Sequence, residues 1–347
     1  MTLNPQLCPA IRIEGRPSIP MQNETRYGFF VDNVRAVWRA IGAFAILLSM
    51  KKSLQPRPVA DIAPSAAHAA PRKKRFLRKA LSAAAALYLF ADLFGKAQFV
   101  TCRYEIEDAR IQSDVRIAIV SDLHGALYGA GQSEIVDTLE TAKPHAVLLL
   151  GDLFDQHGNN ENTVTLLHAL AGRFKCYFIL GNHEYKSGET VSIRAAIEAA
   201  GIPILDGASA VIRSDETEVR LYGIDDGRGG KAKQLQQIAD AAAQRSDDEF
   251  SILAIHVPNG VESYLHYGFD LMLAGHTHGG QIVVPGVLNG LYAPGQGFFP
   301  KYGGGRYDFG NQTLIISRGL ARKPFWLPRI CNPPELTLVT LKPRTGE

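Results

Sequence analysis

Histidines and oxygen donors recur together in four short blocks of the sequence, S-D-L-H, G-D-L-F-D, G-N-H-E and G-H-T-H. Imidazole nitrogens and carboxylate or amide oxygens are donors that divalent transition metals bind in proteins. Two cations about 3.5–4 Å apart neutralise an anionic phosphodiester and supply a bridging hydroxide for in-line attack. The pattern therefore predicts a dinuclear metal hydrolase. The polar residues of the blocks are Asp122, His124, Asp152, Asp155, Asn182, His183, His276 and His278.

Each block follows an apolar run that has the composition of a buried strand. The runs are continuous rather than alternating, as expected of strands buried on both faces. Helical patterns separate them at 133–142, 162–172 and 190–201, with Ser133 as N-cap and Gly201 ending the last helix. The pattern is α/β, in which active residues lie at the carboxyl ends of strands. The predicted strands are 115–122, 146–152, 176–182, 219–225, 250–257, 270–277, 313–319 and 336–342.

The order of these blocks, with His256 between the last two, resembles that of the calcineurin-like metallophosphoesterases. The resembling motifs cover residues 122–278. S-D-L-H-G, G-H-T-H-G-G-Q, S-R-G-L and a carboxyl-terminal P-P-E-L are similar to the membrane-associated bacterial branch, with its UDP-2,3-diacylglucosamine pyrophosphatase-like enzymes. The resemblance implies a four-layer α/β/β/α sandwich over 101–347 and a hydrolase that cleaves phosphodiester or pyrophosphate bonds.

The resemblance also assigns a role to each polar residue. Asp152 would bridge two divalent ions, for which mixed nitrogen and oxygen donors suit Mn, Fe and Zn alike. His183 would give a proton or hydrogen bond to the leaving oxygen, and Asp155 would orient it. Arg318, at a strand end, is a candidate contact for the substrate phosphate. The first metal would take Asp122, His124, Asp152 and His278, and the second Asp152, Asn182, His256 and His276.

The first hundred residues carry a different pattern. Residues 1–26 are polar, without periodicity, and are predicted to be disordered. Residues 27–100 combine apolar runs with a linker in which nine Lys or Arg stand beside the single acid Asp61. A basic cluster before the apolar run 80–91 is typical of a signal anchor. The alternatives are a helix on the membrane surface and ordinary packing. We predict a helical appendage that associates the protein with the bacterial inner membrane. The sequence does not determine on which side of this membrane the catalytic domain lies.

Composition restricts the classes of partner. The net charge of +3 over 347 residues, with 20% charged residues, is that of a globular protein. The catalytic part has no basic, aromatic-interleaved stripe, so no nucleic acid partner is expected. The cysteines include no C-x-x-C; Cys176 suits buried packing, and Cys102 and Cys331 can pair only if the fold brings them together.

Two aromatic segments near the carboxyl terminus suggest contacts with apolar groups. The segment 279–306 is predicted to form a loop or hairpin over the pocket, or a self-packed loop. In K-P-F-W-L-P-R-I (323–330), aromatic and basic residues mix as they do at membrane interfaces, although packing of the last strand explains it nearly as well. The aromatic residues of the first segment that would face a lipid-linked group are Tyr292, Phe298, Phe299 and Tyr302.

Within the predicted phosphoesterase, two substrates compete. One is a lipid-linked nucleotide sugar such as UDP-2,3-diacylglucosamine, cleaved in lipid A synthesis with the site facing the cytosol. The other is an extracytoplasmic cell-wall phosphodiester. A non-catalytic scaffold is the third hypothesis, but it predicts the loss of at least one ligand, and every ligand position is filled.

Overall fold

The computed structural model describes residues 99–344 except 159, 226–229, 285 and 323–326. The predicted disordered segment and nearly all of the helical appendage therefore lie outside the described residues, as do Lys323, Phe325 and Trp326. Among the described helices, none combines the length and the apolar composition that crossing a membrane requires.

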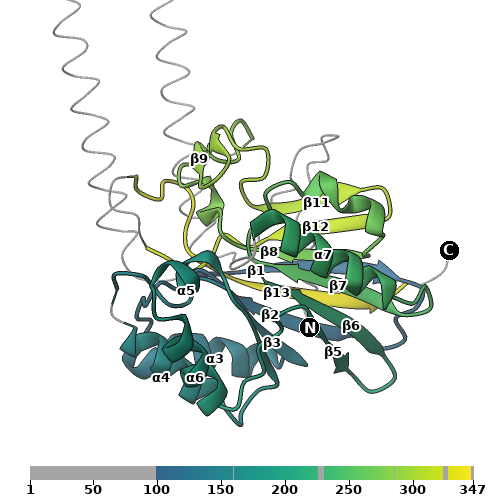
Figure 1. Ribbon diagram of the computed structural model, residues 1–347, viewed down its shortest axis with the longest axis horizontal. Helices are drawn as coiled ribbons and strands as arrows, with labels where there is room; N and C mark the ends of the chain where they lie inside the picture. Colours follow the sequence, from purple (N-terminus) through teal and green to yellow (C-terminus); the bar gives the residue numbers. More distant parts are fainter. Residues whose placement is uncertain (1–98, 159, 226–229, 285, 323–326, 345–347) are drawn as a thin grey trace, which may run out of the picture. The chain divides into compact units, whose positions relative to one another are not determined.

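One mixed sheet has five strands in the order β1-β13-β2-β3-β4 (Figure 1). The strands β2, β3 and β4 are parallel, β13 is antiparallel to β2, and β1 is parallel to β13. Every residue of β3 and β4 is buried, which explains their continuous apolar sequences. The bounds are β1 (Val100–Asp108), β2 (Val115–Val120), β3 (Ala146–Leu150), β4 (Cys176–Ile179) and β13 (Glu335–Pro343).

A second mixed sheet has six strands in the order β11-β12-β8-β7-β6-β5. Its four central strands are parallel, and the two edge strands are antiparallel to their neighbours. The bounds are β5 (Ala208–Arg213), β6 (Glu218–Ile224), β7 (Phe250–Ile255), β8 (Leu271–Ala274), β11 (Gly305–Phe309) and β12 (Gln312–Ile316).

Three hydrophobic clusters hold these elements together. Alternate residues of β2 separate two of them: Val120 packs with the helices α3, α4 and α6, and Ile119 packs with residues of the second sheet such as Ile252. A third cluster joins the second sheet to Ile238 of α7. In Figure 1, α3, α4 and α6 lie together beside the first sheet, and α7 lies beside the second. The helices are α3 (Ser133–Ala142), α4 (Glu161–Leu170), α5 (Asn182–Lys186), α6 (Thr190–Ala199) and α7 (Gly230–Ala243).

Short elements complete the described part of the chain. The hairpin of β9 (Tyr292–Ala293) and β10 (Gly297–Phe298) occupies the segment predicted to be a loop or hairpin. The 3-10 turns are η1 (Ala130–Gln132), η2 (Val261–Ser263), η3 (Leu265–Tyr267) and η4 (His278–Gly280).

The α/β class is confirmed, whereas several local predictions need correction. The N-cap role of Ser133 is wrong, because Ser133 is the first helical residue and Gln132 precedes it in a left-handed conformation without a side-chain cap bond. The predicted strands 115–122 and 270–277 end early, at Val120 and Ala274. The residues beyond these ends include Asp122 and His276, whose φ angles of 50° and 70° are incompatible with a strand.

Candidate metal centre

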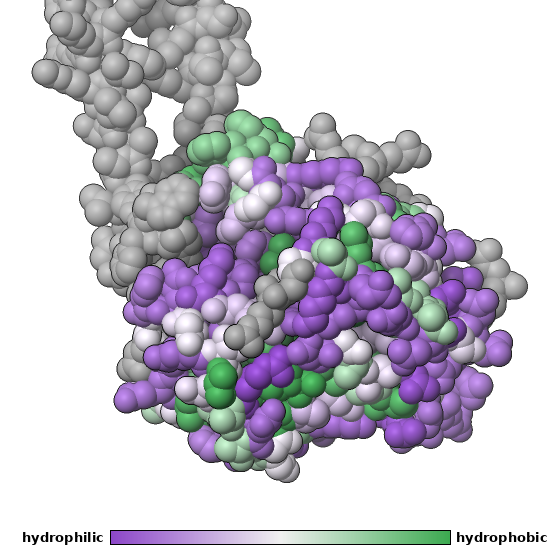
Figure 2. Space-filling view, in the orientation of Figure 1, coloured by the Kyte–Doolittle hydropathy of each residue, from purple (hydrophilic) through white to green (hydrophobic). Residues whose placement is uncertain are grey.

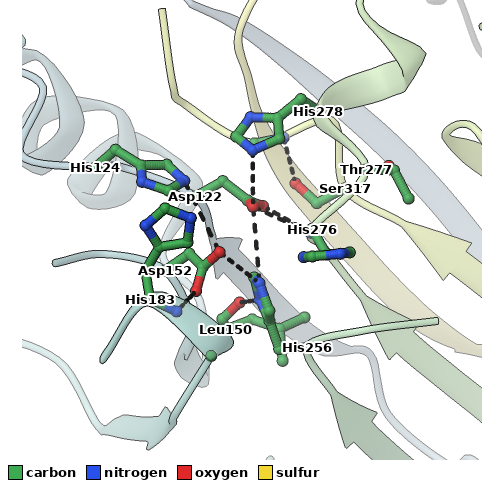
Figure 3. A network of polar contacts seen from close by, with 12 residues as sticks. Asp122, His124, Leu150, Asp152, His183, His256, His276, Thr277, His278 and Ser317 are labelled. Carbon is green, nitrogen blue, oxygen red and sulfur yellow. Dashed lines mark hydrogen bonds and ion pairs between the residues drawn. The ribbon is translucent and has the colours of Figure 1, made fainter. Parts of the chain in front are cut away.

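The polar residues of the four sequence blocks lie at the carboxyl ends of strands from both sheets. Backbone hydrogen bonds join the loops beyond the strands: Asp122 donates to the Gly151 carbonyl at 2.9 Å, and His124 donates to the Asp152 carbonyl at 3.1 Å. In Figure 3, the rings of His124, His183 and His278 surround the carboxylates of Asp122 and Asp152. Segments far apart in the sequence therefore present their donors to a common centre.

Three overlapping groups of side chains have ligand atoms within 4.8 Å of one another. One group contains Asp122, His124 and His278, and a second contains Asp152, His256 and His276. These two groups contain most of the side chains expected at the two metal sites. Asn182 is in neither group, and Asp152 is in the second group only. The third group adds His183 to His124 and Asp152.

Backbone strain is concentrated in these loops. Non-glycine residues rarely adopt positive φ, which costs of order 1–3 kcal/mol each and clusters at functional sites. These residues therefore accept an unfavourable backbone conformation, which places their side chains at the cluster. The expected metal ligands with positive φ are Asp122 (50°), His124 (47°), Asp152 (53°), His276 (70°) and His278 (50°).

The hydrogen bond of His256 fixes its tautomer. Its Nδ1 lies 2.8 Å from the Leu150 carbonyl oxygen, which only accepts, so Nδ1 carries the proton. Nε2 then directs its lone pair toward Asp152 Oδ2, 3.0 Å away. Two lone pairs at this distance require a shared cation or proton between them. This arrangement fits a metal ligated by both residues.

Two further observations test whether a metal fits. His124 Nε2 is buried and has no hydrogen-bond partner within the part of the chain that the structure describes. The Asn182 side-chain amide lies 2.8 Å from His276 Nδ1, so an amide oxygen turned to that nitrogen would share a cation with it. Burying a polar atom without a partner is costly, and a bound cation removes that cost. The donor set therefore fits divalent transition metals.

The electrostatics of the cluster favour the ligating forms of Asp152 and His276. Burial opposes the charge of Asp152, but His256, followed by His124, holds its pKa well below the usual value. Burial lowers the pKa of His276 to about 3, so its imidazole is neutral near pH 7. A carboxylate and a neutral imidazole are the forms that bind metal. Burial raises the pKa of Asp122. Burial also opposes the charge of His124, but interactions with Asp155 and Asp152 raise its pKa, so a bound cation has to displace a proton at these two positions.

Asp155 lies beside two imidazoles. Its Oδ1 is 3.4 Å from His183 Nδ1 and 3.7 Å from His124 Nδ1. The interaction with His124, outweighing burial, lowers the pKa of Asp155 to about 2. The predicted pairing with His183 is therefore shared with His124. The His183 side chain is 23% exposed and that of His124 9%, so His183 is the more accessible of the two.

The sequence analysis left the role of Glu184 undefined, and the structure provides one. The buried Glu184 carboxylate accepts hydrogen bonds from the backbone N–H groups of Asp152, Leu153, Phe154 and Gly181, at 2.8–3.1 Å. Burial raises the pKa of Glu184 to about 7. Glu184 occupies the third position of a short helix, and its bond from the Gly181 N–H is the glutamate half of a capping box. A glutamate at this position is the sequence signal that could have revealed its role. Glu184 thus fixes the loop that carries Asp152.

Gly151 allows His256 to approach this loop. Its φ is 72°, and a Cβ there would overlap the His256 ring. The absence of a side chain at this position therefore lets the loops of the two sheets meet.

Arg318 contacts polar side chains from two other segments. Its guanidinium donates to Asn289 Oδ1 at 3.2 Å and to Asn332 Oδ1 at 3.4 Å, and its Nε lies 3.6 Å from Glu335 Oε2. Contact with a substrate phosphate stays a prediction.

The aromatic residues predicted to face a lipid-linked group divide into two kinds. Tyr302 is buried against Tyr307, so it presents little surface to a lipid-linked group. Phe298 and Phe299 are 65% and 70% exposed. Cys102 and Cys331 are free thiols and do not pair.

Comparisons with known proteins agree with this geometry. Residues 115–280 match the family model for the calcineurin-like phosphoesterases. The chain is 30% identical over 233 residues to phosphodiesterase YaeI of Escherichia coli, covering 65% of this chain and 82% of YaeI. The chain belongs to the calcineurin-like metallophosphoesterases. This metallophosphoesterase is thus a hydrolase of phosphoester bonds that uses divalent metals.

Two other relatives of this metallophosphoesterase differ in length. Metallophosphoesterase YkuE of Bacillus subtilis is 28% identical over 212 residues, covering 60% of this chain and 71% of YkuE. The transmembrane protein with metallophosphoesterase domain of Bos taurus is 28% identical over 227 residues, covering 60% of this chain and 49% of that protein. The chain thus spans about half of the bovine relative.

Proposed function

We propose that this enzyme hydrolyses a phosphodiester or pyrophosphate bond at a centre that holds two divalent cations. The observation that carries the proposal is the convergence of two donor groups on Asp152, whose Oδ2 lies 3.0 Å from His256 Nε2 and 3.9 Å from His124 Nε2. When bound, the cations would neutralise the phosphoryl group and activate the attacking water. In this proposal Asp152 ligates both cations.

The remaining ligands divide between the two sheets. Asn182 comes from the end of β4, whereas the second sheet contributes histidines only. An amide oxygen adds no negative charge, which limits repulsion of an anionic substrate. The proposed first site uses Asp122, His124, Asp152 and His278, and the proposed second uses Asp152, Asn182, His256 and His276.

His183 is proposed to act on the leaving group rather than on a metal. Its backbone N–H donates to Asp152 Oδ1 at 2.7 Å, which places the ring at the edge of the centre. Its Nδ1 faces Asp155, so Nε2 is the nitrogen that gives a proton or hydrogen bond to the leaving oxygen. Burial lowers the pKa of His183, and Asp155 orients the ring and offsets part of that lowering.

The finer fold assignment belongs to the same proposal. The cluster that contains Ile119 and Ile252 lies between the sheets, and two further clusters attach helices to them. These clusters support a four-layer α/β/β/α sandwich for the domain 101–347.

An exposed apolar surface supports a membrane- or envelope-associated substrate. Val287, Phe298 and Phe299 are 77%, 65% and 70% exposed. Figure 2 shows hydrophobic residues gathered over the β9 hairpin, at the top of the view. Aromatic side chains at such a surface suit contact with a bilayer or a lipid-linked group. The relatives from Bos taurus and Danio rerio that are named transmembrane proteins agree with a membrane location.

The test of the function is hydrolysis of bis(p-nitrophenyl) phosphate by the full-length protein in detergent, with Mn²⁺. We expect metal-dependent turnover that a chelator abolishes. A protein that cleaves neither an aryl phosphodiester nor a pyrophosphate with Mn²⁺, Fe²⁺ or Zn²⁺ would instead be a non-catalytic scaffold.

Topology separates the two substrate candidates. A reporter fused after Glu347 and active only in the cytosol would favour UDP-2,3-diacylglucosamine and exclude the cell-wall diester. A reporter active only outside would do the reverse.

A further inference from the structure

Arg329 is a half-buried cation with two buried donor atoms that no group in the described part of the chain uses. Its Nη2 donates to the carbonyl oxygens of Arg318 at 2.7 Å and Gly319 at 3.3 Å. Its Nε and Nη1 are buried and have no hydrogen-bond partner among residues 99–344 as described. Glu335, a nearby carboxylate, lies beside Arg318 instead. The carboxylates of Asp122 and Glu335 act on the charge of Arg329, but neither accepts a hydrogen bond from Nε or Nη1. Because buried donors without an acceptor are costly, this position suits a ligand that supplies an acceptor oxygen.

The segments that hold Arg329 contact Asp122 and adjoin His278, two expected ligands of the first metal. A Cβ on Gly319 would lie 2.5 Å from Asp122 Cβ, so the carbonyl-bearing turn packs directly against that ligand. The residue after Arg329, Ile330, donates from its backbone to the Gln281 carbonyl at 3.1 Å, three residues after His278. The guanidinium thus lies at the Asp122 and His278 side of the centre.

Arg329 keeps its charge in this setting. Burial lowers the pKa of its guanidinium to about 10, so it remains protonated at neutral pH. Guanidinium groups form strong, charge-assisted hydrogen bonds with phosphate oxygens. Arg318, eleven positions earlier, has Asn289, Asn332 and Glu335 around its guanidinium. The two arginines therefore differ in the donors that they leave for a ligand.

We propose that Arg329 binds a non-bridging phosphoryl oxygen of the substrate through Nε or Nη1. The inference rests on the proposed phosphoesterase function and adds a substrate-binding residue on the first-metal side of the centre. The group that it recognises is an anionic phosphoryl, whose oxygen would accept the hydrogen bonds that Nε and Nη1 do not make within the described part of the chain.

The test compares arginine variants in the full-length, Mn²⁺-loaded protein in detergent. Arg329→Gln removes the charge, and Arg329→Lys keeps it without the planar donors. Arg322→Gln is the matched control, because the exposed Arg322 lies over the Tyr128 ring at 4.5 Å. Calorimetry gives the affinity for inorganic phosphate, kinetics give KM and kcat, and elemental analysis gives the metal content.

We expect Arg329→Gln to weaken phosphate binding about tenfold to a hundredfold and to raise KM, with wild-type metal content. Arg329→Lys should fall between it and the wild type, and Arg322→Gln should match the wild type. An Arg329→Gln variant with the phosphate affinity and KM of the wild type would overturn the inference. If the wild-type protein hydrolyses the phosphodiester in the same assay, the proposed function still stands. Loss of metal and a lowered melting temperature in both Arg329 variants would also overturn it, since they indicate a structural role. A wild-type protein without turnover whose phosphate binding still depends on Arg329 would support the inference and reject the function.

Discussion

Two polar clusters lie at opposite ends of the same strands and differ in how their atoms are paired. At the distal cluster, formed by Asp108, Arg110, Ser251 and Asp270, donors meet acceptors. Asp270 Oδ1 accepts from Arg110 Nη2 at 2.7 Å, and Asp270 Oδ2 accepts from Ser251 N and Oγ at 2.8 and 2.7 Å. At the metal centre, acceptors face acceptors, as His256 Nε2 faces Asp152 Oδ2.

This difference separates a stabilising arrangement from a functional one. The distal cluster stabilises the folded chain by itself, because its donors and acceptors are paired. The metal centre combines facing lone pairs with positive φ angles, so it stabilises the fold only when a ligand is bound. The carboxyl ends of the strands, where the metal centre lies, are the usual position for activity in α/β proteins. Equivalent substitutions at the two ends should therefore have opposite effects.

The largest expected effect comes from Asp152→Asn. Loss of the proposed shared ligand removes several kcal/mol of charge stabilisation, so kcat should fall by at least about a thousandfold. Elemental analysis should show less metal per chain than in the wild type. The matched control is Asp270→Asn, the same change at the distal cluster. It should leave kcat unchanged and lower the free energy of unfolding by about 1–3 kcal/mol. Equal losses of turnover in the two variants would remove the distinction between the clusters.

His183→Ala tests whether the third histidine group is part of a metal site. As a donor to the leaving oxygen, His183 should contribute about a hundredfold to ten-thousandfold to kcat. The metal content should stay at the wild-type value by elemental analysis. A variant that loses metal would make His183 a ligand, as its proximity to His124 and Asp152 allows.

Glu184→Gln sharpens the comparison, because Glu184 belongs to the metal centre but is paired like the distal cluster. An amide cannot accept all four backbone N–H groups without directing its own NH₂ group at some of them. We expect about a tenfold to hundredfold weaker metal binding, since outer partners orient the ligands. Calorimetric Mn²⁺ titration measures this, and an unchanged affinity would restrict Glu184 to holding the fold.

The smallest expected effect is the pH dependence of the distal cluster. The hydrogen bond from Arg110, outweighing burial, lowers the pKa of Asp108. Because the pKa of Asp108 is lower in the folded state, its carboxylate stabilises the fold at pH values above its unfolded-state pKa of about 4. This stabilisation is lost as the pH falls through the folded-state pKa. Urea unfolding should show Asp108→Asn less stable than wild type at pH 6, by under about 1 kcal/mol, and equally stable at pH 2. A difference that persists at pH 2 would assign the effect to packing.

The sequence predicts the strands that precede the metal-centre loops better than it predicts the edge strands of the sheets. β2, β3 and β4 are continuous apolar runs, whereas β1 alternates buried Tyr104 and Ile106 with exposed charged residues and was not predicted. The polar residues of the metal centre could be identified because each follows such a run. Local pattern therefore identifies ligand-bearing loops.

Local pattern does not identify contacts between segments distant in the sequence. It does not distinguish Arg318 from Arg329, whose surroundings come from loops around Gln281, Asn289 and Glu335. The backbone hydrogen bonds that Glu184 accepts cannot be predicted from local pattern for the same reason, since three of the four donors lie about thirty residues away in the sequence.

The metal stoichiometry of the full-length protein, measured by elemental analysis together with phosphodiester turnover, tests the central claim most directly. The protein should hold about two divalent ions per chain, lose both ions and turnover on chelation, and regain turnover as Mn²⁺ is titrated to two equivalents. Full turnover with a single ion per chain, or two bound ions with no hydrolysis of any phosphodiester or pyrophosphate, would contradict a dinuclear phosphoesterase.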